Sequence, residues 1–503
     1  MGTPLLTRAV LLALLAASPL GCRTSPPAPS FILISVDTLR ADQVGCYGAR
    51  RDITPRLDRL SRQGTFFKTV VSTSSWTLPA HMSMLTGQLA SIHGVNRDSV
   101  ALDPERPFLP EILHDAGYDT AGFVSGPFVD ARYGFSRGFD TYRNFWGAEE
   151  QVLEKGKLRE GPGGVLRRLH QQAIRASHQD HTGPEVTAAA TRWLANHRGH
   201  PFFLFIHLWE PHYDYIPPPP FDRRFIPPGY TGSLPINDYV YNPRINPRMA
   251  PEDLAYVISQ YDGEIAFTDF LIGKILDQVE ALGLAGGTLL MVTSDHGEEF
   301  FEHGRKGHRK TLYDESLRVP LVVRGPGVAA RPEGIDTQVS LIDLAPTLLG
   351  ATGLPRPGDM MGENLWPLLE RGQRPVDPGG AAGDLPAPPP GAMMRPAPFA
   401  VSSLEGAPRP GGPCSIFSLR TPRWKAIFTC ADGVEVYDLA RDPGEQRPGL
   451  PRAAGGAADI LRQARTIRAS LHELARTLPR QGRDRVILDQ ALKKRLRALG
   501  YLK

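Results

Sequence analysis

Cysteine is scarce in this 503-residue chain, which contains four, so a scaffold held together by disulfide bonds is excluded. Beyond residue 24 the sequence also lacks the run of about 20 apolar residues that a membrane-spanning helix needs. An excess of one charge is missing too, because 57 basic residues face 53 acidic ones and leave a net charge of +4. This near balance gives no reason to expect nucleic acid as a partner. The 41% of hydrophobic residues supports a sizeable core and indicates a large globular protein, most simply an enzyme.

The N-terminal segment 1–24 is typical of an export signal. Arg8 precedes the apolar run Ala9–Ala17, which is too short to cross a bilayer. Leu20-Gly21-Cys22 then resembles the cleavage box of bacterial lipoproteins, in which the cysteine is lipidated and becomes the new N-terminus. We therefore expect an exported protein of the cell envelope, in the periplasm or at the outer membrane, with membrane anchoring through lipidated Cys22. Plain secretion is the alternative.

The remaining cysteines fit export as well. Cys414 and Cys430 bracket two β-rich runs around the turn Arg420–Arg423. Strand pairing centred on Pro422 would place these two cysteines opposite each other, as a cross-strand disulfide requires. Cys46 is then left as a free thiol.

Short apolar runs of strand length recur along the chain and alternate with helical periodicity, as in residues 254–276. Strands that are apolar on both faces and separated by helices indicate an α/β fold, with a large, mostly parallel sheet sandwiched by helices. The runs are Phe31–Val36, Thr120–Val124, Phe202–Leu208, Thr288–Thr293 and Pro320–Val323.

Changes in composition suggest how the chain is divided. A catalytic domain is expected over residues 25–370, interrupted by two polar or proline-rich segments, Glu149–His181 and Tyr215–Pro251. The stretch 371–413 is rich in proline, glycine and alanine and is predicted to be a linker or a surface loop. Residues 414–503 are expected to form a small C-terminal subdomain with an antiparallel hairpin and, from Ile460, an amphipathic helix.

Two of the apolar runs lead into residues that can hold a metal ion. Phe31–Val36 is followed by Asp37, and Leu289–Ser294 by Asp295 and His296. Open α/β folds bind ligands at the carboxyl edge of the sheet, where these side chains would meet. Carboxylate oxygens and an imidazole nitrogen suit a divalent metal ion, although each motif alone is also compatible with an ordinary turn.

A third motif, Ser75-Trp76-Thr77-Leu78-Pro79, predicts the start of a helix, since threonine is a good N-cap and proline is tolerated in a first turn. Thr77 would then lie where free backbone N–H groups and the helix dipole favour an anion. A hydroxyl held there beside a metal ion is an activated nucleophile for an anionic ester, whereas an ordinary capping threonine is the alternative.

Together these residues resemble the sulfatase family of the alkaline-phosphatase superfamily, from about Phe31 to the C-terminus. The matching motifs stand in family order, and they are Ser35–Asp42, Gly45–Gly48, Thr54–Asp58, Leu85–Gly87, Glu210–His212, Tyr261–Ile265, Ser294–Glu298, Leu312–Pro320, Leu344–Leu348, Val436–Leu439 and Leu496–Tyr501. The resemblance implies an alkaline-phosphatase-like fold and a metal-dependent hydrolase of anionic esters. It also implies that His212 protonates the leaving group and that His308 and Lys310 supply a cationic contact.

The sequence departs from the usual sulfatase pattern at the nucleophile. Such enzymes begin their nucleophile helix with Cys or Ser, which is converted to formylglycine, and carry Arg four residues later. Thr77 and His81 occupy these positions here, so no formylglycine is expected. A hydrated aldehyde expels sulfate through its second hydroxyl, an exit that a sulfated threonine lacks, whereas a phosphorylated threonine can be attacked in line at phosphorus. Asp37, Thr77, Asp295 and His296 match the one-metal quartet of Thr-nucleophile transferases in this superfamily.

We therefore expect one divalent metal ion, Ca²⁺, Mn²⁺ or Zn²⁺, bound by Asp37, Thr77, Asp295 and His296. Phosphate or phosphonate esters are favoured over sulfate esters, and the substrate is an anionic ester that is glycan- or lipid-linked. Three other functions stay open: a sulfuric ester hydrolase of the arylsulfatase type, an envelope phosphotransferase, and a non-catalytic glycan-binding relative. The retained metal ligands argue against the last of these.

Overall fold

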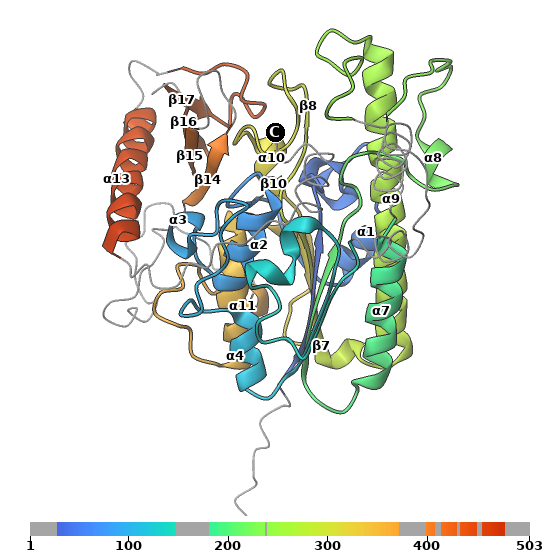
Figure 1. Ribbon diagram of the computed structural model, residues 1–503, viewed down its shortest axis with the longest axis vertical. Helices are drawn as coiled ribbons and strands as arrows, with labels where there is room; N and C mark the ends of the chain where they lie inside the picture. The colour runs from blue at the N-terminus through green and yellow to red at the C-terminus, as the bar shows by residue number, and fades with distance from the viewer. Residues whose placement is uncertain are drawn as a thin grey trace, which may run out of the picture.

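The computed structural model describes residues 28–146, 181–236, 239–371, 399–407, 414–429, 433–449 and 455–477. A large sheet forms the centre, helices cover both of its faces, and a second, smaller sheet lies beside it (Figure 1). None of the helices within these ranges is long and apolar enough to cross a membrane. The predicted leader 1–24, with Cys22, lies outside the described residues, as does all but the last residue of Glu149–His181.

The central sheet has eight strands, and it confirms the predicted mostly parallel arrangement. Its strands are β1 (Ser30–Val36), β2 (Thr65–Phe67), β4 (Asp119–Val124), β5 (Thr141–Asn144), β6 (Phe202–Leu208), β7 (Thr288–Ser294), β11 (Leu321–Arg324) and β12 (Arg331–Ile335). Their order is β12-β2-β11-β7-β1-β6-β4-β5. The five strands from β7 to β5 are parallel, whereas β11 runs antiparallel to both β7 and β2. Each of the five predicted apolar runs coincides with one of these strands, to within a residue at either end.

Two layers of helices cover the central sheet (Figure 1). One layer contains α1 (Pro55–Gln63), α7 (Gly183–Asn196) and α9 (Pro251–Ala281), and the other contains α2 (Thr77–Thr86), α4 (Leu109–Asp115) and α11 (Leu344–Thr352). Successive side chains of a strand point to opposite faces. In β1, Ile32 and Ile34 join the core on the α9 side, whereas Phe31 and Leu33 join the core on the α2 side. A strand buried on both faces must be apolar at every position, which is why it reads as a continuous run.

Shorter elements connect these layers. They are α3 (Ala90–His93), α8 (Phe221–Arg224), α10 (Asp314–Leu317), α12 (Trp366–Arg371), the three-stranded sheet of β10 (Arg318–Val319), β3 (Val70–Val71) and β13 (Val339–Ser340), and the hairpin of β8 (Glu299–Phe300) and β9 (Lys306–Gly307). Cys46 follows β1 in a short 3₁₀ turn and is a free cysteine. Burial raises its pKa to about 12, so the thiol stays protonated and unreactive at neutral pH.

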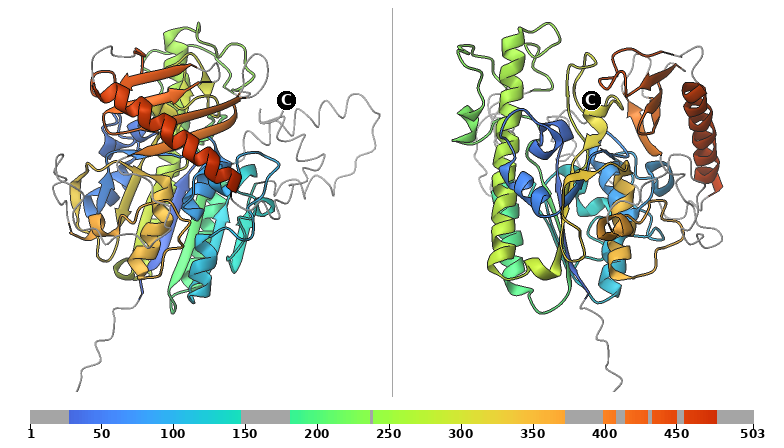
Figure 2. Two further views of the ribbon diagram at one scale, coloured as in Figure 1. Left: turned by 90° about the vertical axis from the view of Figure 1, so that its left-hand side faces the viewer. Right: turned by 180° about the vertical axis from the view of Figure 1, so that it is seen from behind.

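The C-terminal part forms an antiparallel sheet with one helix across it (Figure 2). Its elements are β14 (Ala400–Ala407), β15 (Cys414–Arg420), β16 (Trp424–Phe428), β17 (Val434–Asp438) and α13 (Gly455–Thr477). The predicted hairpin is the β15–β16 pair at the centre of this sheet. β14 lies within the stretch 371–413 that was expected to be a linker, so that expectation is corrected for Ala400–Ala407. Pairing with the next strand, β15, makes this stretch a strand, and its composition alone does not reveal that pairing.

The β15–β16 hairpin also has a different register from the predicted one. Arg420 pairs with Lys425, so the turn is centred between residues 422 and 423 rather than on Pro422. Cys430 and the side chain of Cys414 lie outside the described part of the chain, and the disulfide between them stays a prediction.

Buried ion pairs join the C-terminal sheet to the catalytic domain. Asp314 of α10 accepts hydrogen bonds from Arg420 Nη2 at 2.9 Å and from Lys425 Nζ at 2.8 Å. Lys425 also pairs with Glu445 Oε1 at 2.8 Å. All four side chains are buried. The small sheet is therefore packed into the same body as the central sheet and its helices.

A second contact links the C-terminal sheet to the segment that leads into α2. Ser402 Oγ donates to the backbone oxygen of Ser72 at 2.6 Å, and the N–H of Ser403 donates to that of Thr73 at 2.9 Å. The edge strand β14 thus supports the chain just before Thr77.

Candidate active site

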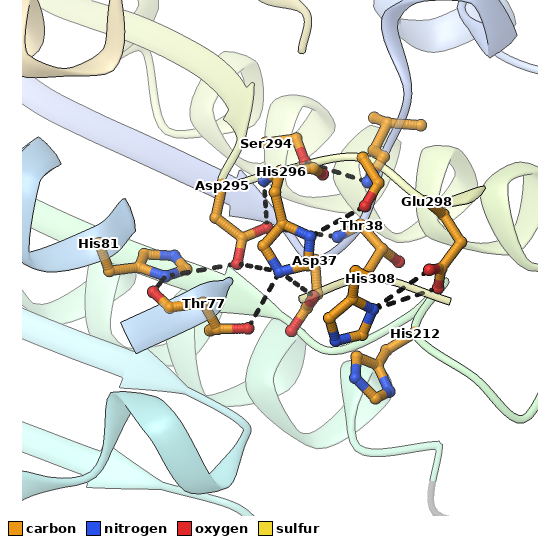
Figure 3. Close-up of polar contacts among 12 residues, drawn as sticks. Asp37, Thr38, Thr77, His81, His212, Ser294, Asp295, His296, Glu298 and His308 are labelled. Carbon is orange, nitrogen blue, oxygen red and sulfur yellow. Dashed lines mark hydrogen bonds and ion pairs between the residues drawn. The ribbon is translucent and has the colours of Figure 1, made fainter. Parts of the chain in front are cut away.

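Asp37, Asp295 and His296 form a buried cluster at the carboxyl edge of the sheet (Figure 3). Asp37 follows β1, and Asp295 follows β7, which lies beside β1 with Val36 opposite Ser294. One donor atom of each cluster residue lies within 4.8 Å of the others. The predicted metal ligands are thus neighbours because two adjacent parallel strands end at the same level.

The chemistry of this cluster fits a divalent cation. Both carboxylate oxygens of Asp37 and Oδ2 of Asp295 have no hydrogen-bond partner among the described residues. Burial and the neighbouring Asp295 raise the pKa of Asp37 well above its ordinary value. His296 Nδ1 lies 2.9 Å from the backbone oxygen of Gly297, which directs Nε2 toward the two carboxylates. Buried carboxylates without partners are costly, and a cation between them removes that cost.

Thr77 is the first residue of α2, and its Oγ1 lies 3.2 Å from His296 Nε2. The N-cap is Trp76. The capping preference of threonine had suggested Thr77 for that position. No side-chain hydrogen bond caps this helix. Pro79, the third helical residue, has no N–H for a cap to bind. The Thr77 hydroxyl is therefore directed at the metal cluster instead of at its own helix.

His81 and His207 lie beside the carboxylates on the α2 side of the sheet. His81 Nδ1 donates to the backbone oxygen of Thr77 at 2.9 Å, and Nε2 accepts from Ser35 Oγ at 2.9 Å. The ring of His207 is 4.5 Å from that of His81, and its Nε2 is 3.4 Å from Asp37 Oδ2. Burial lowers the pKa of His81 to about 3 and that of His207 to about 4, so both rings are neutral at physiological pH. The rings of His81 and His207 are thus neutral. His81 itself stands at the position where the resemblance to sulfatases predicts a charged arginine.

His212 and His308 face the cluster from the other side (Figure 3). Their rings are 5.0 Å apart, and the His308 ring is 4.6 Å from that of His296. Glu298 holds His308 through an Nδ1–Oε1 contact of 3.2 Å and accepts from Tyr215 Oη at 2.9 Å. Burial, followed by the neighbouring His308, lowers the pKa of His212 well below its ordinary value.

The two remaining basic residues of this region have different surroundings. Lys310 Nζ donates to the backbone oxygen of Lys306 in the β8–β9 hairpin. The Arg309 guanidinium lies 3.8 Å over the Trp76 ring, and the Arg309 N–H donates to the backbone oxygen of Ser75 at 2.8 Å. Of the three basic residues in the run 308–310, Arg309 is therefore the one held against the residues that precede Thr77.

Four residues of this region were not singled out from the sequence: His81 as a neighbour of the carboxylates, His207, Glu298 and Arg309. His207 carried a usable signal, because it is the single polar residue in the seven-residue strand β6. Arg309 lies between the two predicted basic residues, where the sequence gives no means of choosing among neighbours.

The chain is similar to several known proteins. Residues 29–354 match the protein family described as Sulfatase. Arylsulfatase K of Bos taurus is 24% identical over 455 residues, which cover 84% of this chain and 78% of that protein. The crystal structure of phosphonate monoester hydrolase of Agrobacterium radiobacter superposes with a TM-score of 0.68 at 23% identity, covering 89% of this chain and 96% of that one. The structure of BT4656 in complex with its substrate D-glucosamine-2-N,6-O-disulfate gives a TM-score of 0.66 at 20% identity, covering 91% and 99%.

Proposed function

The chain belongs to the sulfatase family and is an ester hydrolase, and from this premise we propose that it cleaves phosphate or phosphonate esters with Thr77 as the nucleophile. The observation that carries the proposal is the 3.2 Å contact between Thr77 Oγ1 and His296 Nε2. This contact puts a hydroxyl at a helix N-terminus directly beside a cluster suited to a divalent cation.

Asp37, Asp295 and His296 would hold one divalent ion, with Thr77 Oγ1 next to it. Such an ion, when bound, lowers the pKa of the hydroxyl and withdraws charge from the phosphoryl oxygens. Two carboxylates and one imidazole are compatible with Ca²⁺, Mn²⁺ or Zn²⁺, and the imidazole favours the latter two. No formylglycine is needed, since the threonine oxygen itself attacks.

The residues of the chain supply the other steps. Thr77 releases its hydroxyl proton to solvent, and Oγ1 attacks phosphorus in line, forming a bond to phosphorus while the bond to the leaving alcohol breaks. His212 gives its proton to that leaving oxygen. An anionic ester beside His212 favours the imidazolium form and offsets the burial that lowers its pKa, so substrate binding itself charges the acid. Water then attacks the phosphothreonine, and phosphate or phosphonate leaves.

Phosphorus is favoured over sulfur because of the threonine. A sulfate on Thr77 has no second hydroxyl through which to depart, whereas phosphorus accepts direct attack by water. The solved structures similar to this chain include phosphonate monoester hydrolases as well as sulfatases, so either ester class fits this fold. Hydrolysis of sulfate esters is the second candidate, because arylsulfatase K and an ulvan-active sulfatase are among the relatives.

We propose further that the enzyme works outside the cytoplasm on an ester carried by a glycan or a lipid. The support is the leader-like segment 1–24 and the lipoprotein-like box ending at Cys22. An envelope phosphotransferase would share the first chemical step, with an alcohol in place of water in the second.

The deciding experiment compares rates on aryl phosphate, aryl phosphodiester, aryl phosphonate and aryl sulfate, using protein reconstituted with Mn²⁺ or Zn²⁺. Thr77→Ala is expected to abolish turnover of the phosphorus esters, and Thr77→Ser, the matched control, to retain it. A quenched reaction should carry phosphate on Thr77, seen by peptide mass spectrometry. Sulfate cleavage that dominates, or turnover that survives in Thr77→Ala, would refute the proposal.

A further inference from the structure

A second group of metal-ligating side chains lies outside the active site. It consists of Glu299 of β8, His303 in the turn of the β8–β9 hairpin, and Glu315 of α10. One donor atom from each of these residues lies within 4.8 Å of the others. None of the three has a part in the chemistry proposed for Thr77.

Glu299 is fully buried, at 0% exposure. Its Oε2 accepts a hydrogen bond from Thr311 Oγ1 at 3.0 Å, but Oε1 has no partner among the described residues. A buried carboxylate oxygen without a donor is costly, and here a second carboxylate, that of Glu315, lies close by. Either a cation or a proton must therefore compensate the negative charge of these two carboxylates.

His303 is oriented as a metal ligand would be. Its Nε2 lies 3.0 Å from the backbone oxygen of Glu445, and its ring stacks on Tyr313 with centroids 3.5 Å apart. With the Nε2 proton donated to that carbonyl, Nδ1 is directed at Glu315 Oε1, 2.6 Å away. Although burial opposes it, the hydrogen bond to Glu315 raises the pKa of His303 to about 9, so a proton lies between these two atoms at the position that an ion would take. In many metal sites, a backbone carbonyl that accepts a hydrogen bond from one ring N–H likewise fixes the tautomer of the histidine ligand.

A cavity of about 190 Å³ reaches the Glu315 end of the group. Glu315 belongs both to the group and to the lining of this cavity. The lining contains four acidic side chains, including Glu302 and Asp314, against the two arginines Arg40 and Arg318. A volume of this size holds several waters, at about 30 Å³ each in the liquid, so a hydrated cation can enter and keep part of its shell.

We propose that Glu299, His303 and Glu315 bind a divalent transition-metal ion, Zn²⁺ or Mn²⁺, at a second site separate from the catalytic one. The ion displaces the Nδ1 proton of His303 to solvent. The two carboxylates and the neutral imidazole then carry a charge of −2, which the ion cancels, and the donor set is the one these ions accept. The ion would join the β8–β9 hairpin to α10. Through the carbonyl of Glu445 it would also fix the hairpin against the C-terminal part.

The experiment counts metal ions in the full chain. Protein is saturated with Zn²⁺, desalted and analysed by inductively coupled plasma mass spectrometry, and we expect two ions per wild-type chain. Glu299→Gln and His303→Gln should each lose one ion, and Asp295→Asn should lose the other. Glu302→Gln, an acidic neighbour in the same hairpin turn, is the matched control and should keep both.

Wild-type protein that binds a single ion, lost in Asp295→Asn, would overturn the proposal and leave a hydrogen-bonded carboxylate–imidazolium group in its place. Retention of both ions by folded Glu299→Gln would overturn it too. Should that variant fail to fold by circular dichroism, the wild-type count and His303→Gln still decide. A failure of the proposed catalytic function is recognised separately, because that function depends on the other ion, which is the one lost in Asp295→Asn.

Discussion

Substitution of Asp314 is the most direct test of the buried ion pairs that join α10 to the C-terminal sheet. In Asp314→Asn, the amide still fills the space, but the negative charge between Arg420 and Lys425 is gone. Lys425 keeps Glu445 as an ionic partner at 2.8 Å, whereas the other partners of Arg420, Gln338 Oε1 and the backbone oxygen of Thr421, are neutral. Arg420 is 6% exposed and so becomes a buried charge without a counterion.

Breaking a buried ion pair from one side costs about 3–5 kcal/mol, and the lower end applies here because Lys425 stays paired. We therefore expect Asp314→Asn to lower the free energy of unfolding by about 3 kcal/mol. The assay is urea denaturation at pH 7 followed by tryptophan fluorescence. Asp438→Asn is the matched control, since its partner Arg423 is largely exposed and its loss should matter far less.

The same pair of variants gives a pH test with a definite sign. Although burial opposes it, Arg420 and Lys425 hold the pKa of Asp314 well below its ordinary value. A carboxylate with a lowered folded-state pKa stabilises the fold fully above its unfolded-state pKa of about 3.9, and loses that contribution as pH falls further. The difference between wild type and Asp314→Asn should thus shrink by about 1.4 kcal/mol per unit below pH 3.9. Equal effects of the two variants, or a difference that does not change in acid, would refute this reasoning.

Three further outcomes are expected. His212→Gln should slow esters with poor leaving groups by about 10²–10⁴-fold while sparing those whose alcohol leaves without a proton, and a uniform loss across leaving groups would count against an acid role. Treatment with a chelator should abolish turnover, and Mn²⁺ or Zn²⁺ should restore it; activity in fully metal-free protein would contradict the site. Gly297→Ala would place a Cβ 2.0 Å from the backbone oxygen of Glu315, so it should displace the neighbouring His296. Metal binding measured by titration should therefore weaken. Gly286→Ala, at a position with open space around it, is the control and should leave metal binding unchanged.

The sequence predicted the parts of the molecule that are encoded locally. Each apolar run marked a buried strand, and the residue that follows such a run lies at the carboxyl edge of the sheet. Asp37 and Asp295 were found in this way, and the structure brings them to within 4.8 Å of each other with His296. Thr77 was found through Pro79 and through the capping preference of threonine, though as a cap rather than as the first helical residue.

What escaped prediction depends on partners far along the chain. The antiparallel course of β11 is set by its pairing with β7 and with β2, which lies more than 250 residues earlier in the chain. His207 gains significance only because β6 lies next to β1, which brings its ring within 3.4 Å of Asp37. Arg309 and Lys310 are adjacent in sequence yet have different contacts, which follows from the positive φ of 61° at Arg309.

The contact between Ser402 and Ser72 has a consequence for the synthesis and folding of the chain. These residues are 330 positions apart, and β14 supports the segment that leads into Thr77. A growing chain emerges N-terminus first, so the nucleophile is made early but its support is made late. A chain that stops before β14 would hold every proposed ligand of the catalytic metal and still lack the strand that fixes Thr77. We expect such a product to bind metal without hydrolysing esters.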